Sequence, residues 1–177
     1  MVRLMKPMKQ KELFDALTTA LGKIKTTTKL LRQNKTFDPS LATRLPLKIL
    51  VAEDNVINQK VFLRLLQQFG YLADLAVDGK QVLEAIERQK YDLVFMDVQM
   101  PKMDGLEATR HICERLDPSE RPYIVALTAN ALKEDRERCL AAGMDEYISK
   151  PVRAEKIQNS IECAAIRLGQ DRKFGEG

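Results

Sequence analysis

From residue 47 onward, short apolar runs alternate with stretches of helical periodicity, five of each. The expected strands cover 48–52, 71–77, 91–96, 123–127 and 146–149, and the expected helices cover 56–69, 81–89, 106–116, 133–142 and 154–168. Strands that alternate with helices form parallel sheets covered by helices on both faces. Because crossovers between parallel strands are right-handed, the simplest arrangement is a doubly wound α/β sheet.

Candidate site residues follow four of the five expected strands. They are Glu53 and Asp54 after the first strand, Asp97 after the third, Thr128 and Ala129 after the fourth, and Lys150 and Pro151 after the fifth. The C-terminal ends of parallel strands share one edge of the sheet, where ligands gather. Three carboxylates at one edge repel each other unless a cation lies among them. Oxygen ligands without a nearby His or Cys suit a hard ion such as Mg²⁺.

The remaining polar groups at this edge suit a phosphoryl group. Lys150 would neutralise its charge and the Thr128 hydroxyl would donate a hydrogen bond to it. An aspartate beside the metal can act as a nucleophile and form an acyl phosphate. Taken alone, Asp97 could equally be a turn or helix-capping residue before Pro101 and Gly105, but the other residues at the same edge favour the chemical role.

Together with the run Met-Pro-Lys-Met-Asp-Gly at 100–105, these residues resemble the response regulator receiver domain in order and spacing. The resemblance covers about residues 47–168. It implies a flavodoxin-like (βα)5 fold with strand order 2-1-3-4-5. It also implies that Asp97 accepts a phosphoryl group from a phosphohistidine, carried by a kinase dimerisation domain or a histidine phosphotransfer domain.

The resemblance assigns further roles residue by residue. Mg²⁺, or Mn²⁺ in its place, would be held by Glu53, Asp54, Asp97 and the backbone carbonyl of Gln99. The phosphoryl oxygens would be held by Lys150, the Thr128 hydroxyl and the backbone N–H groups of Gln99 and Ala129. Thr128 and Tyr147 would switch the face made by the last two helices and the strand between them. The Lys150–Pro151 bond is expected to be cis.

Hydrolysis of the aspartyl phosphate is tuned in this family at two positions, which here are Gln99 and Asn130. Both are amides, so no acid is poised to align a water molecule. We therefore expect a phosphorylated form that is not unusually short-lived, and a lifetime of seconds would contradict this.

The sequence of residues 50–60 resembles that of receivers at the C-terminal end of hybrid sensor histidine kinases. Residues 4–8 (Leu-Met-Lys-Pro-Met) match residues 148–152 (Ile-Ser-Lys-Pro-Val), and similar helical spacing follows both. The expected organisation is a remnant of an upstream receiver-like domain (1–22), a basic linker (23–46), the receiver (47–168) and a tail (169–177). Chance is the alternative explanation of the repeat.

No residues match a kinase ATP-binding domain. The chain is therefore expected only to promote its own phosphorylation and dephosphorylation, while its parent is expected to be a histidine protein kinase. Two other readings remain open, a stand-alone response regulator and a phosphate-independent interaction module on the same fold. A dehalogenase-type phosphatase would need an aspartate at position 99 as general acid, and that position holds Gln99. In a dinucleotide or flavin site, Glu53 and Asp54 would repel the phosphate of the ligand.

Charge and cysteine content restrict the partners and the compartment. Residues 1–46 carry ten Lys and Arg against three acidic residues, so the net charge of +4 arises from this N-terminal segment. This favours a solvated linker over a nucleic-acid site, which needs a basic folded face. No apolar run approaches the ~18 residues of a membrane span. The three separated cysteines are typical of reduced thiols in a cytoplasmic chain. Dimerisation through the expected helix at 9–21 stays open.

Overall fold

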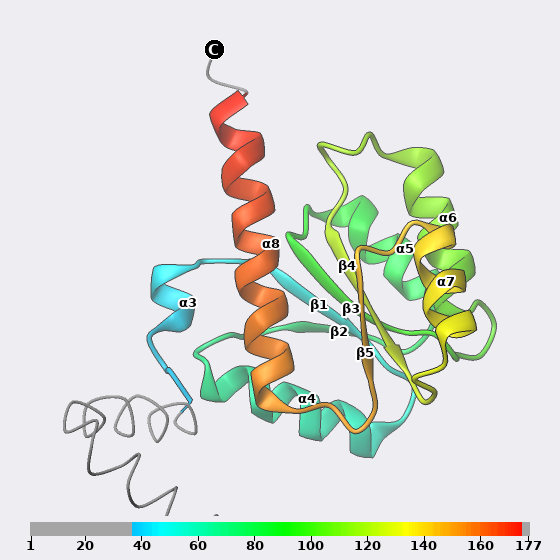
Figure 1. Ribbon diagram of the computed structural model, residues 1–177, viewed down its shortest axis with the longest axis horizontal. Coiled ribbons are helices and arrows are strands. Elements are labelled where there is room, and N and C mark those ends of the chain that lie inside the picture. The colour runs from blue at the N-terminus through cyan, green and yellow to red at the C-terminus, as the bar shows by residue number, and fades with distance from the viewer. Residues whose placement is uncertain (1–36, 175–177) are drawn as a thin grey trace, which may run out of the picture. The chain divides into compact units, whose positions relative to one another are not determined.

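The computed structural model describes residues 37–174, which contain a five-stranded parallel sheet in the order β2-β1-β3-β4-β5 (Figure 1). The strands are β1 (Ile49–Ala52), β2 (Asp74–Ala76), β3 (Leu93–Asp97), β4 (Tyr123–Thr128) and β5 (Glu146–Ser149). The helices are α3 (Leu41–Arg44), α4 (Val56–Gln68), α5 (Gly79–Arg88), α6 (Gly105–Arg115), α7 (Lys133–Ala142) and α8 (Ala154–Phe174). The predicted doubly wound fold and its strand order are confirmed.

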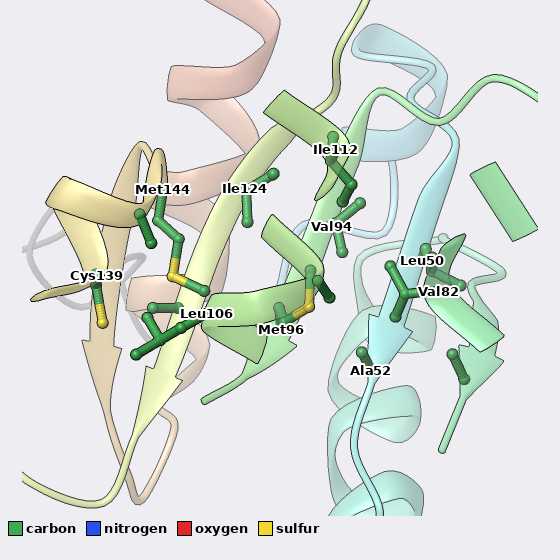
Figure 2. Close-up of a cluster of buried hydrophobic side chains, with 14 of the residues drawn as sticks. Leu50, Ala52, Val82, Val94, Met96, Leu106, Ile112, Ile124, Cys139 and Met144 are labelled. Atoms are coloured by element: carbon green, nitrogen blue, oxygen red, sulfur yellow. The ribbon is translucent and has the colours of Figure 1, made fainter. Parts of the chain in front are cut away.

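Helices cover both faces of the sheet, with α4 and α8 on one side and α5, α6 and α7 on the other (Figure 1). Every residue of β1 and of β3 is buried, as expected for strands covered on both faces. Leu50, Val94 and Ile124 pack in one cluster with side chains of α5, α6 and α7 (Figure 2). On the opposite face, the rings of Phe62 on α4 and Phe95 on β3 lie 4.8 Å apart.

The bounds of several elements differ from those expected, among them those of β2, α5 and α8. β2 has three residues instead of the seven expected, and it forms an edge of the sheet with only one of the three buried. α5 begins at Gly79, where the Asp78 side chain accepts a hydrogen bond from the Gln81 N–H and caps the helix. α8 runs on to Phe174, past the expected end at 168. Among the described residues, no helix has the length and apolar character needed to span a membrane.

The short helix α3 lies in the last part of the segment expected to be a linker. Leu41 is fully buried, and the Ala42 N–H donates to the Phe69 carbonyl at the end of α4. The Tyr71 hydroxyl donates to the Leu45 carbonyl at 2.6 Å. These residues therefore pack against the same domain as the sheet. The expected remnant at 1–22, its helix at 9–21 and the linker up to residue 36 lie outside the described residues.

Candidate functional site

A cleft of ≈ 720 Å³ opens at the C-terminal edge of the sheet. The expected site residues that line it are Glu53, Asp54, Asp97, Gln99, Thr128, Ala129, Asn130 and Lys150. They come from the ends of four elements of the sheet and from the loops that follow. The parallel register of β1, β3, β4 and β5 brings these ends together.

Lys150 joins two buried carboxylates at the bottom of the cleft. Its Nζ donates to Asp97 Oδ2 at 2.8 Å and to Glu53 Oε2 at 2.9 Å. The side chain of Asp97 is 8% exposed and that of Glu53 is 3% exposed, whereas that of Lys150 is 25% exposed. Both buried acids have lost most of their hydration. The ammonium group of Lys150 compensates the charges of both carboxylates.

Asp54 joins Glu53 and Asp97 in a cluster of three carboxylates in the cleft. One carboxylate oxygen from each of Glu53, Asp54 and Asp97 lies within 4.8 Å of the others. Asp54 is exposed, so it faces solvent while its two partners are buried. An all-oxygen donor set of this kind fits a hard divalent cation such as Mg²⁺, whose charge would offset three carboxylates where Lys150 supplies only one positive charge.

The two buried acids differ in how their charges are stabilised. Burial raises the pKa of Asp97, and neighbouring Glu53 adds to this, so that the opposing effect of Lys150 does not restore the ordinary value. Burial also acts to raise the pKa of Glu53, but hydrogen bonds from Lys150 and the Asn55 N–H outweigh it and lower the pKa. Burial acts to lower the pKa of Lys150, yet its two carboxylate partners raise it. Asp97 is thus the less stabilised of the two anions, which suits a nucleophile.

The hydroxyl of Thr128 stands at the end of β4 beside the carboxylates. It donates to the Asn130 carbonyl at 3.0 Å and accepts from the Asn130 N–H at 3.2 Å. The Lys150 N–H donates to the Thr128 carbonyl at 2.7 Å, which ties the ends of β4 and β5 together. The Lys150–Pro151 peptide bond is cis. Thr128 is 6% exposed, while Ala129 and Asn130 are exposed at the rim of the cleft.

The loop between β3 and α6 supplies a wall of the cleft. The Gln99 N–H donates to Asp97 Oδ1 at 3.1 Å, which orients the carboxylate. The Gly105 N–H donates to the Val98 carbonyl at 3.0 Å and closes the loop at its far end. Asp104 caps α6 by accepting from the Glu107 N–H at 2.8 Å. The turn expected at this place is therefore a short loop that leads directly into the helix.

The expected switch residue Tyr147 does not line this cleft. It lies on β5, half-buried, in a hollow of ≈ 360 Å³ bordered by α7 and by the start of α8. The guanidinium of Arg136 on α7 stands 5.4 Å from the centre of its ring. The ring therefore occupies the face formed by α7, β5 and α8.

Sequence reasoning missed four residues that shape the cleft. The Asn55 side chain accepts from the N–H groups of Ile57 and Asn58 and caps α4, which an Asn before an amphipathic helix could have indicated. Gln59 donates to the Glu53 carbonyl at 2.6 Å. Asp135 and Arg138 on α7 line the far side of the cleft. These last contacts depend on tertiary packing, so no sequence signal marks them.

Comparisons with known proteins agree with this geometry. The family model of the response regulator receiver domain matches residues 49–162. Hybrid signal transduction histidine kinase K of Dictyostelium discoideum is 45% identical over 125 residues, which are 66% of this chain and 10% of that protein. Histidine protein kinase 1 of Candida albicans is 41% identical over 143 residues, which are 76% of this chain and 6% of that protein. The chain thus spans a tenth or less of these relatives.

Solved structures give the same picture. The receiver domain of sensor histidine kinase PA1611 from Pseudomonas aeruginosa is 42% identical with a TM-score of 0.62, covers 67% of this chain and 97% of its own, and has a magnesium ion coordinated in its active site cleft. The Saccharomyces cerevisiae receiver domain of Ssk1, crystallised with the histidine phosphotransfer protein Ypd1, is 29% identical with a TM-score of 0.61, covering 65% of this chain and 86% of that one. The chain belongs to the response regulator receiver domain family.

Proposed function

We propose that this receiver takes a phosphoryl group from a phosphohistidine onto Asp97 in a phosphorelay. The observation that carries the proposal is the position of Asp97, a buried carboxylate 2.8 Å from the ammonium of Lys150 and beside the oxygens of Glu53 and Asp54. A capping aspartate would accept hydrogen bonds from the N–H groups at the start of a helix. Asp97 instead lies at the bottom of a cleft open to a donor.

The transfer requires an ionised Asp97. Its Oδ attacks phosphorus in line with the bond to the donor nitrogen, that bond breaks, and the imidazole nitrogen keeps the electron pair. Lys150 then leaves one carboxylate and contacts a phosphoryl oxygen, and the Thr128 hydroxyl exchanges the Asn130 carbonyl for another. The backbone N–H groups of Gln99 and Ala129 contact the remaining oxygens. Catalysis consists of positioning and charge compensation.

Mg²⁺, or Mn²⁺ in its place, would be held by Glu53, Asp54, Asp97 and the backbone carbonyl of Gln99. The bound ion supplies positive charge that offsets the phosphoryl oxygens and the carboxylates. The magnesium ion in the cleft of the PA1611 receiver supports this assignment. The donor set of the present cleft supports it independently, because its carboxylates outnumber the one ammonium that faces them.

The output of phosphorylation is a change of the face formed by α7, β5 and α8. When the Thr128 hydroxyl turns toward the phosphoryl group, it leaves its contacts with Asn130 and frees space at the end of β4. Tyr147, on the neighbouring strand and only half-buried, moves into that space. Such a shift between two packed arrangements is the usual form of a ligand-driven switch.

The donor is proposed to dock beside the cleft on the first turns of α4. Val56, Ile57 and Val61 are 60%, 73% and 54% exposed there. A groove of ≈ 120 Å³ continues this surface, and Val61, Val152 and Lys150 are among the residues that line it. A histidine phosphotransfer domain or a kinase dimerisation domain is the expected partner. The crystallised pair of Ypd1 and the Ssk1 receiver supports this class of donor.

The parent protein is proposed to be a hybrid sensor histidine kinase that works in the cytoplasm. The two kinase relatives support this context. The free cysteines Cys113, Cys139 and Cys163 fit a reducing compartment.

The test is incubation of the purified chain with acetyl phosphate and Mg²⁺, followed by intact mass measurement. The wild-type chain should gain one phosphoryl group and Asp97→Asn should gain none. Asp104→Asn is the matched control, because it changes another aspartate at the cleft and keeps an acceptor for the α6 cap. A wild-type chain that gains nothing, or an Asp97→Asn chain that is still modified, would contradict the proposal.

A further inference from the structure

The loop after Asp97 contains a strained turn. Among the described residues, Lys102 is the sole non-glycine with a positive φ, which is 64°. The Met103 N–H donates to the Pro101 carbonyl at 2.7 Å, so the three residues form a γ-turn. The form of this turn with positive φ is rare and strained. Strain of this kind persists only where the surrounding structure holds it in place.

The start of α5 holds this turn from the side. The Gly79 N–H donates to the Met103 carbonyl at 3.0 Å, which is a bond from one strand-to-helix connection to another. A Cβ on Gly79 would lie 2.7 Å from the same carbonyl oxygen and 2.9 Å from the Met103 Cβ. Only glycine therefore allows the loop to approach this closely, although Gly79 itself has ordinary helical geometry.

Asp78 adds a second contact at the same point. It is 2% exposed, and its Oδ1 accepts from the Gln81 N–H at 2.9 Å as the cap of α5. Its Oδ2 lies 3.6 Å from the Nζ of Lys102. A helix cap needs an acceptor but no charge, so the ion pair with the central residue of the strained turn is a separate interaction.

The loop is thus attached at both ends, and Gln99 forms one of the two attachments. At one end, the Gln99 N–H donates to Asp97 Oδ1. At the other, Met103 is bound to Gly79 and Lys102 faces Asp78. The orientation of the Gln99 backbone therefore depends on how the loop is held at these two ends.

We infer that Asp78 and Gly79 are positioning residues for the phosphorylation site, although neither lines the cleft. By holding the γ-turn they set the position of the Gln99 carbonyl toward the divalent ion and of its N–H toward Asp97. The inference rests on the proposed function and deepens it. It places a determinant of metal affinity at the start of α5, outside the cleft that the carboxylates line.

The experiment measures Mg²⁺ affinity in the unphosphorylated chain, from the ¹H–¹⁵N shift of the Gln99 amide during titration. Gly79→Ala should weaken the affinity about tenfold or more, since a displacement of about an ångström at a preorganised site has effects of this size. Gly169→Ala is the matched control, because a Cβ there meets nothing within 4 Å. Alanine favours helix formation over glycine at both positions, so both chains should remain folded.

The ion pair is tested with Asp78→Asn and Lys102→Met, which keep the cap acceptor and the stem of the lysine. Each should weaken Mg²⁺ binding roughly two- to fivefold, the size expected for one partly exposed pair, and the double variant should be no weaker than the worse single one. Unchanged affinity in Gly79→Ala, in a wild-type background that binds Mg²⁺ and is phosphorylated, would overturn the inference alone. A wild-type chain that neither binds Mg²⁺ nor accepts a phosphoryl group would overturn the proposed function instead.

Discussion

Gly105 packs directly on the backbone of Asp97. A Cβ at position 105 would collide with the Asp97 carbonyl oxygen and would lie 2.9 Å from Cγ of Met96. The first residue of α6 therefore lies against the backbone at the end of β3, too close to leave room for a side chain. This contact accounts for a glycine at the first position of α6.

Replacement of Gly105 by alanine should impair the site more than the fold. Overpacking at a buried position costs about 1–3 kcal/mol of unfolding free energy. The same displacement moves Asp97 relative to Lys150, so we expect the rate of phosphorylation by acetyl phosphate to fall by about 10²-fold. Urea unfolding and intact mass kinetics measure the two effects. A variant with normal kinetics would show that the contact does not set the position of Asp97.

The sheet and most of the site could be predicted because they depend on local patterns. Apolar runs of strand length mark β1, β3 and β4, and parallel strands bring their C-terminal ends to one edge. A polar residue after each run is then enough to assemble Glu53, Asp97, Thr128 and Lys150. Predicting that these residues come together therefore requires no knowledge of how the intervening loops fold.

Contacts between loops could not be predicted in the same way. Gly79 and Met103 are bonded across two connections, and neither residue carries a periodic signal that would mark the pair. β2 was expected to be longer because Tyr71 reads as part of an apolar strand, whereas its side chain turns back to bind the backbone of Leu45. Tertiary hydrogen bonds of this kind override local propensity.

Asp97→Asn should stabilise the fold while it abolishes phosphorylation. Burial and the adjacent Glu53 raise the pKa of Asp97, so its charged form is less favourable in the folded chain than in the unfolded one. A neutral amide removes this cost, and Lys150 keeps Glu53 as its partner. Without Mg²⁺ at neutral pH, we therefore expect urea unfolding to give a higher unfolding free energy for Asp97→Asn than for the wild type. Loss of stability in Asp97→Asn, with Asp104→Asn unchanged, would contradict this account.

Leu41→Ala tests whether α3 belongs to the folded domain. Leu41 is fully buried, although its segment was expected to be a linker. Truncation of a buried leucine costs about 2–5 kcal/mol. The exposed Leu132, which is 62% exposed, provides the matched control, and its replacement by alanine should change stability little. Equal thermal midpoints for the two variants would return residues 38–46 to the linker.

Ile57→Asp should weaken transfer from a protein donor and spare transfer from a small molecule. Ile57 is 73% exposed beside the cleft and is not among the residues that line it. With phosphorylated Ypd1 as the donor, we expect a rate about tenfold lower, since a charge placed in an apolar interface costs about 1.4 kcal/mol or more. With acetyl phosphate the rate should be unchanged. Leu72→Asp, at a residue that is 86% exposed and outside the cleft, is the control and should leave both rates as they are.

The contact between Tyr71 and α3 should make stability depend on pH in the alkaline range. Burial raises the pKa of Tyr71 from its ordinary value of 10.0 to about 12. The folded chain therefore holds this proton more tightly than the unfolded chain. The stabilisation is fully present below pH 10 and is lost as the pH rises toward 12.

Tyr71→Phe separates this contribution from those of other groups. At pH 8 the variant should be less stable by about 1 kcal/mol, because the hydrogen bond to the Leu45 carbonyl is lost. Between pH 10 and 12, one proton is linked to unfolding in the wild type alone, so its unfolding equilibrium should rise up to about tenfold per pH unit relative to the variant. The stability curves of the two chains should therefore converge and then cross. Parallel curves through this range would mean that Tyr71 ionises in the folded chain as readily as in the unfolded one, and that its hydroxyl does not hold α3.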